Sequence, residues 1–267
     1  MSTLLLVHAH PDDESIMTGG VMARAHEMGH RLVLVTATRG EEGEIHNVDE
    51  ASTRPRLAEV RSEELRKAAE ILGVDRQEFL GYRDSGMAGT PANENSLSFH
   101  QAPLAEAAAR LARVIREEQP EIVVTYDESG TYGHPDHKKA HRTTFAALDL
   151  LEGEGWRPRK AYMHGFPRQA AIDLFRRLQE TGFEMPAEQG QQPAEFGVDD
   201  ARITTIVDVR DQIDRKRAAL AAHVTQNDPK SFFFHVPPEY YEAFFGRETF
   251  ILARGEAAAN PETDLFA

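Results

Sequence analysis

Two short stretches of the chain concentrate side chains that can bind a metal ion. The first, His-Ala-His-Pro-Asp-Asp-Glu at residues 8–14, places two imidazoles and three carboxylates within seven residues. Burying that many ionisable groups is costly unless they are paired or coordinate a cation. Pro11 fixes its own φ and biases His10 toward an extended backbone, which stiffens the turn. His10 and Asp13 can therefore bind one ion from the same side of a tight turn.

The stretch at 8–14 has a second interpretation, in which its carboxylates only cap the helix that follows. This stretch taken alone does not separate the two interpretations. His8 still belongs to the preceding apolar run, so we predict a hydrogen-bonding role for it rather than metal binding.

The second stretch, Tyr-Gly-His-Pro-Asp-His at residues 132–137, repeats the order histidine, proline, aspartate. A ligand from this stretch would complete a set of two histidines and one aspartate, and catalytic zinc typically keeps three protein ligands and one exchangeable position. The chain has no cysteine, which excludes thiolate ligands, disulfides and cysteine nucleophiles. His141, one helical turn after His137, is expected to be solvated or packed. Ferrous iron also suits such a ligand set.

Both stretches follow short apolar runs that are typical of buried parallel strands. These runs are residues 4–7 and 122–126, and a third strand is predicted at 31–36. Helices are predicted between and around the strands at 21–28, 57–72 and 104–118. The alternation predicts an α/β fold, a Rossmann-like three-layer sandwich with a mostly parallel sheet. The carboxyl ends of such strands share one edge, which would bring the two stretches together.

We predict a single continuous domain with two portions. Residues 1–152 would form the Rossmann-like metal-binding core, and residues 153–267 a smaller α/β portion that completes the substrate pocket. The irregular segment 153–200 would shape the far side of that pocket. The tail after Gly255 is rich in alanine, proline and acidic residues, and is predicted to be frayed.

Composition limits the class of partner. Hydrophobic residues make up 40% of 267 residues, enough for a sizeable core. The formal charge of −14 argues against nucleic acid, whose phosphates require concentrated Lys and Arg. The amino-terminal residues suggest neither a signal peptide nor a membrane span, so we expect a soluble cytoplasmic protein without a membrane partner. Whether the chain forms a homo-oligomer is left open.

The sequence resembles the LmbE-like, PIG-L-type family of zinc-dependent N-deacetylases. The resemblance rests on Ala-His-Pro-Asp-Asp-Glu at 9–14 and Gly-His-Pro-Asp-His at 133–137. It is supported by stretches at 40–44, 83–87 and 222–226, so it spans most of residues 3–226. These supporting stretches are most similar to the actinobacterial thiol-pathway branch. That branch includes the deacetylase acting on N-acetylglucosaminyl-inositol and the amidase that cleaves mycothiol conjugates.

The resemblance implies specific roles in metal binding and catalysis. Three residues are implied as zinc ligands, namely His10, Asp13 and His137. The implied catalytic residues are Asp12 as general base, His134 with Asp136 behind it as a charged or proton-donating partner, and Tyr132 near the reacting carbonyl.

The resemblance also implies residues that recognise the sugar, namely Glu44, Arg61, Asp84 and, by a looser match, Asp208. Arg61 lies on the charged helix predicted at 57–72, so an ordinary surface position is the alternative for it. Its guanidinium would also suit a carboxylate-bearing sugar, which keeps N-acetylglucosaminyl-malate open as a substrate.

The predicted reaction is zinc-dependent hydrolysis of the acetamide of an N-acetylglucosaminyl-inositol-like small molecule, releasing acetate and a free amine. A mycothiol-conjugate amidase is an alternative, but that branch has a lysine three residues after the motif's glutamate, where this chain has Met17. A nucleotide-binding module is disfavoured because no Gly-x-Gly-x-x-Gly turn follows the first strand. A metal-storage protein would need a closed ligand set, whereas three ligands leave a position open.

Overall fold

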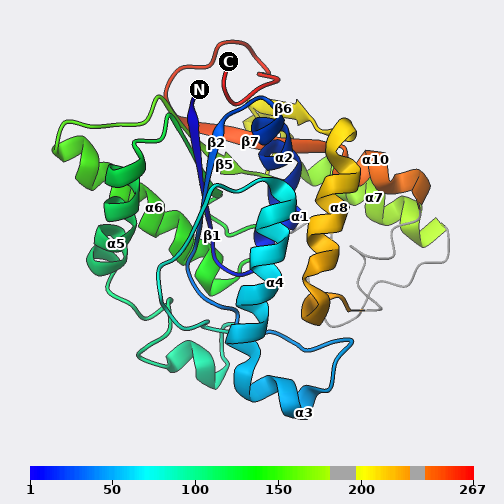
Figure 1. Ribbon diagram of the computed structural model, residues 1–267. Coiled ribbons are helices and arrows are strands. Elements are labelled where there is room, and N and C mark those ends of the chain that lie inside the picture. Colours follow the sequence, from blue (N-terminus) through cyan, green and yellow to red (C-terminus); the bar gives the residue numbers. More distant parts are fainter. Residues whose placement is uncertain (181–196, 229–237) are drawn as a thin grey trace.

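The computed structural model describes residues 1–180, 197–228 and 238–267 (Figure 1). The described strands form one seven-stranded sheet in the order β3-β2-β1-β4-β5-β7-β6. Their bounds are β1 Thr3–His8, β2 Arg31–Thr36, β3 Arg76–Phe79, β4 Ile122–Tyr126, β5 Lys160–His164, β6 Thr205–Asp208 and β7 Arg247–Arg254. The pairs among β1 to β5 are parallel, whereas β7 runs antiparallel to both β5 and β6. The predicted α/β class with a mostly parallel sheet is confirmed.

Helices cover both faces of this sheet (Figure 1). One layer contains α1 Asp13–Met17, α2 Gly19–Glu27, α4 Leu57–Leu72 and α8 Ile213–Ala222, which contact one another. The other contains α5 Leu104–Glu118 and α6 Pro135–Gly153. The remaining described α-helices are α3 Glu50–Thr53, α7 Arg168–Glu180 and α10 Pro238–Phe245. The molecule is therefore the three-layer sandwich that the sequence predicts.

Strand β1 shows how the apolar runs produce these layers. Its successive side chains point to opposite faces. Leu4 and Leu6 pack in the core beneath α2, α4 and α8, while Leu5 and Val7 pack in the core beneath α5 and α6. A strand buried on both faces has no solvent-facing positions, which explains its uninterrupted apolar sequence.

The portion after residue 152 continues the same sheet through β5, β7 and β6. Residues 181–196, which include part of the irregular segment, lie outside the described residues. The division at 152 and the role of 153–200 in the pocket stay predictions. None of the helices in the described ranges combines the length and apolar character that a membrane span requires.

The carboxyl-terminal tail is packed, so the prediction that it is frayed is wrong. Glu262 and Leu265 are 0% and 2% exposed. The Glu262 carboxylate contacts the Lys160 ammonium and accepts a 2.8 Å hydrogen bond from the Tyr162 hydroxyl. The Phe266 ring stacks on His30, with centroids 3.8 Å apart. Glu262 pairs with Lys160, which lies about a hundred residues earlier, so the composition of the tail alone does not predict this contact.

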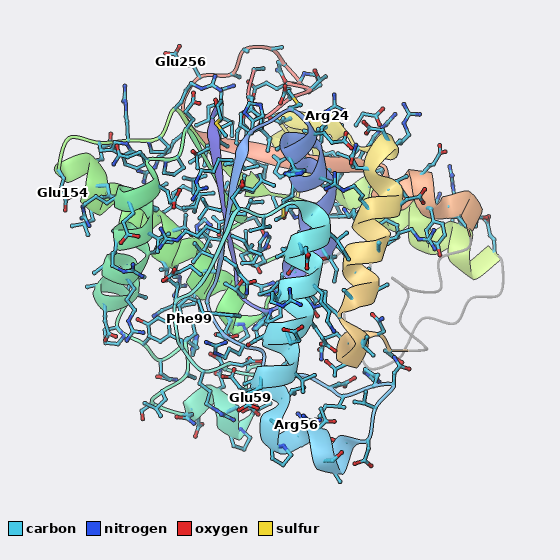
Figure 2. The ribbon with its side chains drawn as sticks, in the orientation of Figure 1. Arg24, Arg56, Glu59, Phe99, Glu154 and Glu256 are labelled. Carbon is cyan, nitrogen blue, oxygen red and sulfur yellow. The ribbon has the colours of Figure 1, made fainter. Side chains whose placement is uncertain are left out.

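Replacing Glu262 with alanine is expected to destabilise the fold by about 3–5 kcal/mol, because the buried Lys160 ammonium would lose the Glu262 carboxylate and keep its 2.9 Å hydrogen bond to the Ala267 oxygen. Urea unfolding of the variant and the parent protein would measure this loss. The matched control is Glu256→Ala, since Glu256 lies exposed on the same tail (Figure 2). A loss no greater than that of the control would show that the pair does not hold the tail.

Candidate metal centre and active site

The two histidine-rich stretches meet at the carboxyl edge of the sheet. Strands β1 and β4 are parallel neighbours, and they end at His8 and Tyr126. The first stretch leads into α1, which begins at Asp13, and the second leads into α6, which begins at Pro135. The topology therefore brings together side chains that lie more than a hundred residues apart in the sequence.

Asp13 lies between two imidazoles. One carboxylate oxygen, Oδ2, is 3.3 Å from His10 Nδ1, and the other, Oδ1, is 3.3 Å from His137 Nε2. All three residues are buried, at 7%, 5% and 0% exposed for His10, Asp13 and His137. Burial alone would raise the pKa of Asp13, but His137 and His10 lower it well below its ordinary value. The carboxylate is therefore ionised in this cluster.

The hydrogen bonds of His137 and Asp13 fit a cation. His137 Nδ1 donates to the Gly130 carbonyl at 3.2 Å, so Nε2 keeps its lone pair. Nε2 is buried and has no hydrogen-bond partner among the described residues, although Asp13 lies beside it. Asp13 Oδ2 accepts hydrogen bonds from the Tyr126 hydroxyl and the His10 N–H, at 2.6 and 2.9 Å, which leaves Oδ1 for an ion. An imidazole nitrogen with a lone pair beside a carboxylate oxygen can bind a divalent cation such as zinc.

The other nitrogen of His10 faces carboxylates. His10 Nε2 is 3.2 Å from Asp136 Oδ2 and 3.5 Å from Asp84 Oδ1. Burial alone would lower the pKa of His10, but Asp84, Asp13 and Asp136 raise it well above its ordinary value. Carboxylates behind a metal-binding imidazole commonly fix its tautomer and orientation. His10 belongs to two groups of side chains that could hold a metal ion, one with His134 and His137 and one with Asp84 and Asp136.

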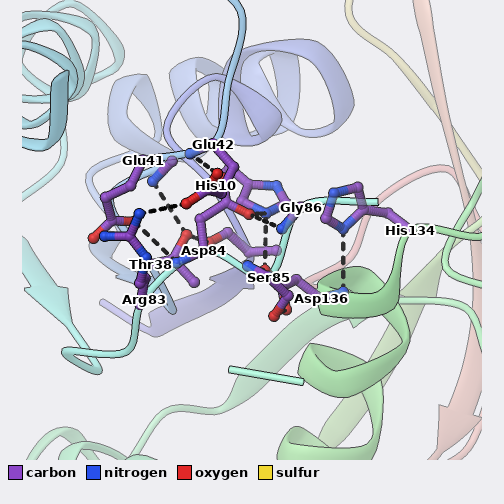
Figure 3. A network of polar contacts seen from close by, with 12 residues as sticks. His10, Thr38, Glu41, Glu42, Arg83, Asp84, Ser85, Gly86, His134 and Asp136 are labelled. Carbon is purple, nitrogen blue, oxygen red and sulfur yellow. Dashed lines mark hydrogen bonds and ion pairs between the residues drawn. The ribbon is translucent and has the colours of Figure 1, made fainter. Parts of the chain in front are cut away.

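The Asp136 carboxylate contacts the His10 ring (Figure 3). The resemblance implies the His134 ring as its partner instead. The Asp136 carboxylate accepts a hydrogen bond from the Ser85 N–H at 2.9 Å and contacts the Ser85 hydroxyl. The contact between Asp136 and His134 runs through the Asp136 backbone N–H, which donates to His134 Nδ1 at 3.1 Å.

His134 caps the amino terminus of α6 and is arranged to act as a neutral donor. Since Nδ1 accepts a backbone hydrogen bond, the proton of the neutral ring is on Nε2. Burial, together with His10 and His137, lowers the pKa of His134 to about 2. The role of His134 as a charged or proton-donating partner stays a prediction. Tyr132, 36% exposed, has its ring centroid 6.0 Å from that of His134.

Asp12 is held in an unusual conformation beside the cluster. Its backbone φ is 111°, a value that residues other than glycine rarely adopt. Its N–H donates to Glu14 Oε2 at 3.0 Å, and its Oδ2 is 3.3 Å from Arg61 Nη2. Burial raises the pKa of Asp12 to about 6, although Arg61 acts in the opposite direction. A carboxylate whose pKa lies near neutrality is suited to general-base chemistry.

Comparison with known proteins identifies the family of this chain. The model of the GlcNAc-PI de-N-acetylase family, PIG-L, matches residues 5–148. A 1D-myo-inositol 2-acetamido-2-deoxy-alpha-D-glucopyranoside deacetylase from Acidothermus cellulolyticus is 44% identical, over 99% of this chain and 94% of its own length. The chain belongs to the PIG-L family. Other relatives at 40–46% identity have the same activity name, which confirms the predicted family and branch.

Solved structures extend the comparison to the PIG-L fold. The N,N'-diacetylchitobiose deacetylase of Pyrococcus horikoshii matches with a TM-score of 0.61 at 22% identity, covering 94% of this chain and 83% of that one. The 4-carboxy-2-hydroxymuconate hydratase GalB of Pseudomonas putida matches with a TM-score of 0.62 at 22% identity, covering 97% and 99%. Because a hydratase shares the fold, the fold alone does not decide the reaction. The named sequence relatives do, and this PIG-L protein is a deacetylase that acts on acetamides.

The residues predicted to recognise the sugar lie in different environments. Asp84 faces His10 from the polar network that Figure 3 shows, with Asp84 Oδ1 accepting from the Gly86 N–H at 2.9 Å. Arg61 is 3% exposed, so it does not take the surface position that was its alternative. It donates to the Gly40 carbonyl at 2.9 Å and contacts the Pro11 carbonyl.

The other two predicted sugar residues are at the surface. Glu44 has a side chain that is 77% exposed, and its carboxylate lies 3.1 Å from His46 Nε2. Asp208, at the end of β6, forms an exposed ion pair with Arg210. Its carboxylate contacts Arg210 rather than the metal cluster, and a role in sugar recognition stays a prediction for both residues.

Four further residues form hydrogen bonds to the predicted site residues or to one another, and the sequence assigns them no role, namely Glu14, Ser85, Tyr126 and His223. Three of them lie within stretches that carry the family resemblance, but nothing in those stretches shows where the side chains point. Tyr126 is the last residue of the apolar strand β4, and this context predicts a core residue. Only the pairing of β1 with β4 places its hydroxyl against Asp13.

Replacing Tyr126 with phenylalanine is expected to weaken metal binding by about 10–100-fold, the usual effect of losing an outer-shell partner. The hydroxyl orients Asp13, and the Tyr126 ring stacks on His137 with centroids 4.2 Å apart. The metal Kd would be measured by competition with a coloured chelator. Tyr82→Phe is the control, because the Tyr82 hydroxyl donates to Glu106, at 3.4 Å, and not to a proposed metal ligand. Equal Kd values for Tyr126→Phe and the parent protein would contradict this role.

Proposed function

We propose that this PIG-L protein hydrolyses the acetamide of N-acetylglucosaminyl-inositol with zinc held by His10, Asp13 and His137. The observation that carries the proposal is the unpartnered His137 Nε2 facing Asp13, with Asp12 beside the cluster. The names of the relatives support the substrate. A small amino sugar as sole partner, without nucleic acid or membrane, and a cytoplasmic location belong to the same proposal.

A zinc ion at this cluster would polarise the acetamide carbonyl and lower the pKa of water near it. The chemistry of the donor set suits zinc, while ferrous iron is the alternative native metal. His10, with Asp136 and Asp84 at its other nitrogen, and His137, with Gly130 at its other nitrogen, are held in orientations that such an ion requires.

Asp12 is the residue that accepts a proton from the attacking water. It is not one of the proposed ligands, and its side chain is 21% exposed, so it can meet solvent and substrate. The proximity of its pKa to neutrality makes the carboxylate ionised at neutral pH while still basic enough to take a proton.

His134 and Tyr132 are the donors. The Nε2–H of neutral His134 can donate a hydrogen bond to the carbonyl oxygen as negative charge develops there. Partial burial and the nearby Asp13 carboxylate raise the pKa of Tyr132, so its hydroxyl stays protonated and can also donate. The proton that Asp12 took from water passes to the nitrogen as the amide C–N bond breaks, so the products are the free amine and acetate.

Two alternative substrates find less support. A carboxylate-bearing sugar such as N-acetylglucosaminyl-malate would need a free guanidinium, but Arg61 already contacts two backbone carbonyls and Asp12. The amidase branch has a lysine at the position of Met17. Here Met17 is 5% exposed in the apolar core, where a lysine would lack a partner.

Primary-amine release from N-acetylglucosaminyl-inositol, N-acetylglucosaminyl-malate and a mycothiol conjugate would test the proposal on one preparation of protein. We expect the highest kcat/KM for the inositol compound. A higher kcat/KM for the malate compound or the conjugate would keep the deacetylase class but replace the substrate.

A further inference from the structure

A buried chain of hydrogen bonds leads to Asp12, the proposed base. The other residues of this chain take no direct part in the proposed reaction. The backbone of Asp12, with φ 111° and ψ −31°, is in a region that a non-glycine residue occupies only when its surroundings hold it there. Such a residue would relax if those restraints were removed. What holds Asp12 therefore bears on where its carboxylate points.

The Ser15 and Ile16 N–H groups hold the Asp12 carbonyl, at 3.0 and 3.1 Å. Glu14 supplies the restraint on the Asp12 N–H. Its Oε2 accepts the Asp12 N–H at 3.0 Å, and its Oε1 accepts a 2.5 Å hydrogen bond from the Ser15 hydroxyl. The residue is 0% exposed, so water does not satisfy the carboxylate. The Asp12 side chain is restrained separately, since Arg61 Nη2 lies 3.3 Å from its Oδ2.

His223 holds Glu14 in turn. Its Nε2 donates to Glu14 Oε1 at 2.8 Å, across 209 residues of sequence. His223 is also 0% exposed, so it can meet neither substrate nor bulk water. It lies at the end of α8, and the next segment is fixed because the Thr225 N–H donates to buried Glu64 Oε1 at 2.8 Å. A role in packing alone would not require the Nε2–H.

We propose that His223 is a positioning residue for the deacetylation. Through Glu14 it keeps the Asp12 backbone in its strained conformation, in which the carboxylate lies beside the metal cluster. The inference rests on the proposed function, in which Asp12 is the base. His223 reaches the reaction only through Glu14 and Asp12, so removing it should slow turnover without changing how substrate or metal binds.

His223→Leu and His223→Gln form a matched pair, because leucine removes the donor and the glutamine amide replaces it. For His223→Leu we expect kcat to fall by about 10–100-fold, the size of effect usual for outer-shell partners. We expect KM and the metal content per chain to stay at the parent values. His223→Gln should recover most of the lost kcat. If the leucine variant does not fold, His223→Asn replaces it, since asparagine is too short to reach Glu14.

A double-mutant cycle with Asp12→Asn separates positioning from a general structural role. If His223 acts through Asp12, adding His223→Leu to Asp12→Asn should cause no further loss of kcat, because coupled residues are not additive. The same 10–100-fold loss in both backgrounds, or a parallel loss of metal, would overturn the inference. So would a wild-type kcat for both His223→Leu and His223→Asn.

Different results would overturn the proposed function and the role of His223. Full activity of the Asp12→Asn single variant would remove the base assignment and with it the premise of the inference. An inactive Asp12→Asn variant beside a fully active His223→Leu variant would leave the proposed function intact and overturn only the role of His223.

Discussion

Replacing Asp12 with alanine is expected to lower kcat by about 10²–10⁴-fold, the usual contribution of a general base. The metal content per chain should not change, because Asp12 is not among the three proposed ligands. Both quantities can be measured on one preparation, kcat from amine release and metal by elemental analysis. The separation of the two readouts is what distinguishes a base from a ligand at this crowded site.

The control for Asp12→Ala is Glu59→Ala, which removes an exposed carboxylate from α4 (Figure 2). It should leave both kcat and metal content at the parent values. Wild-type turnover in Asp12→Ala would rule out Asp12 as the base. A simultaneous loss of metal would instead make Asp12 part of the ligand set, and the water-activating role would need another residue.

Replacing His137 with alanine should remove metal and activity together. The ring is fully buried, its Nδ1 is fixed by Gly130, and its Nε2 points at Asp13, so alanine would remove the imidazole that faces this carboxylate. Losing several kcal/mol of transition-state stabilisation from the metal corresponds to a fall of about 10³-fold in kcat/KM. Metal content and kcat/KM would again be measured side by side.

His26→Ala, at an exposed position on α2, is the control for the loss of an imidazole. It should retain both metal and activity. If His137→Ala bound one metal ion per chain with the parent Kd, the proposed ligand set would be wrong. The group formed by His10, Asp84 and Asp136 would then become the site to examine.

The parts of the fold that could be predicted are those that local sequence determines. Strands β1, β2 and β4 appear as apolar runs because both faces of each are buried. Strand β7 was not predicted, since its antiparallel pairing with β5 and β6 depends on partners far away in the sequence. The packing of the tail through Glu262 was missed for the same reason.

The residues of the site also divide into those that local sequence predicts and those that depend on distant contacts. The residue types at 8–14 and 132–137 suffice to predict where metal ligands would come from, and the parallel sheet brings them together. Their partners could not be predicted, because each depends on a side-chain direction. The Asp136 carboxylate contacts the His10 ring instead of the His134 ring, and the buried Arg61 guanidinium contacts the Pro11 carbonyl.

The most direct test is a zinc titration of metal-free protein, with amine release from N-acetylglucosaminyl-inositol as the readout. We expect no activity above background in the metal-free protein, and activity that rises with added zinc and levels off at one equivalent per chain. Full activity without any bound metal would contradict a metal-dependent deacetylase at His10, Asp13 and His137.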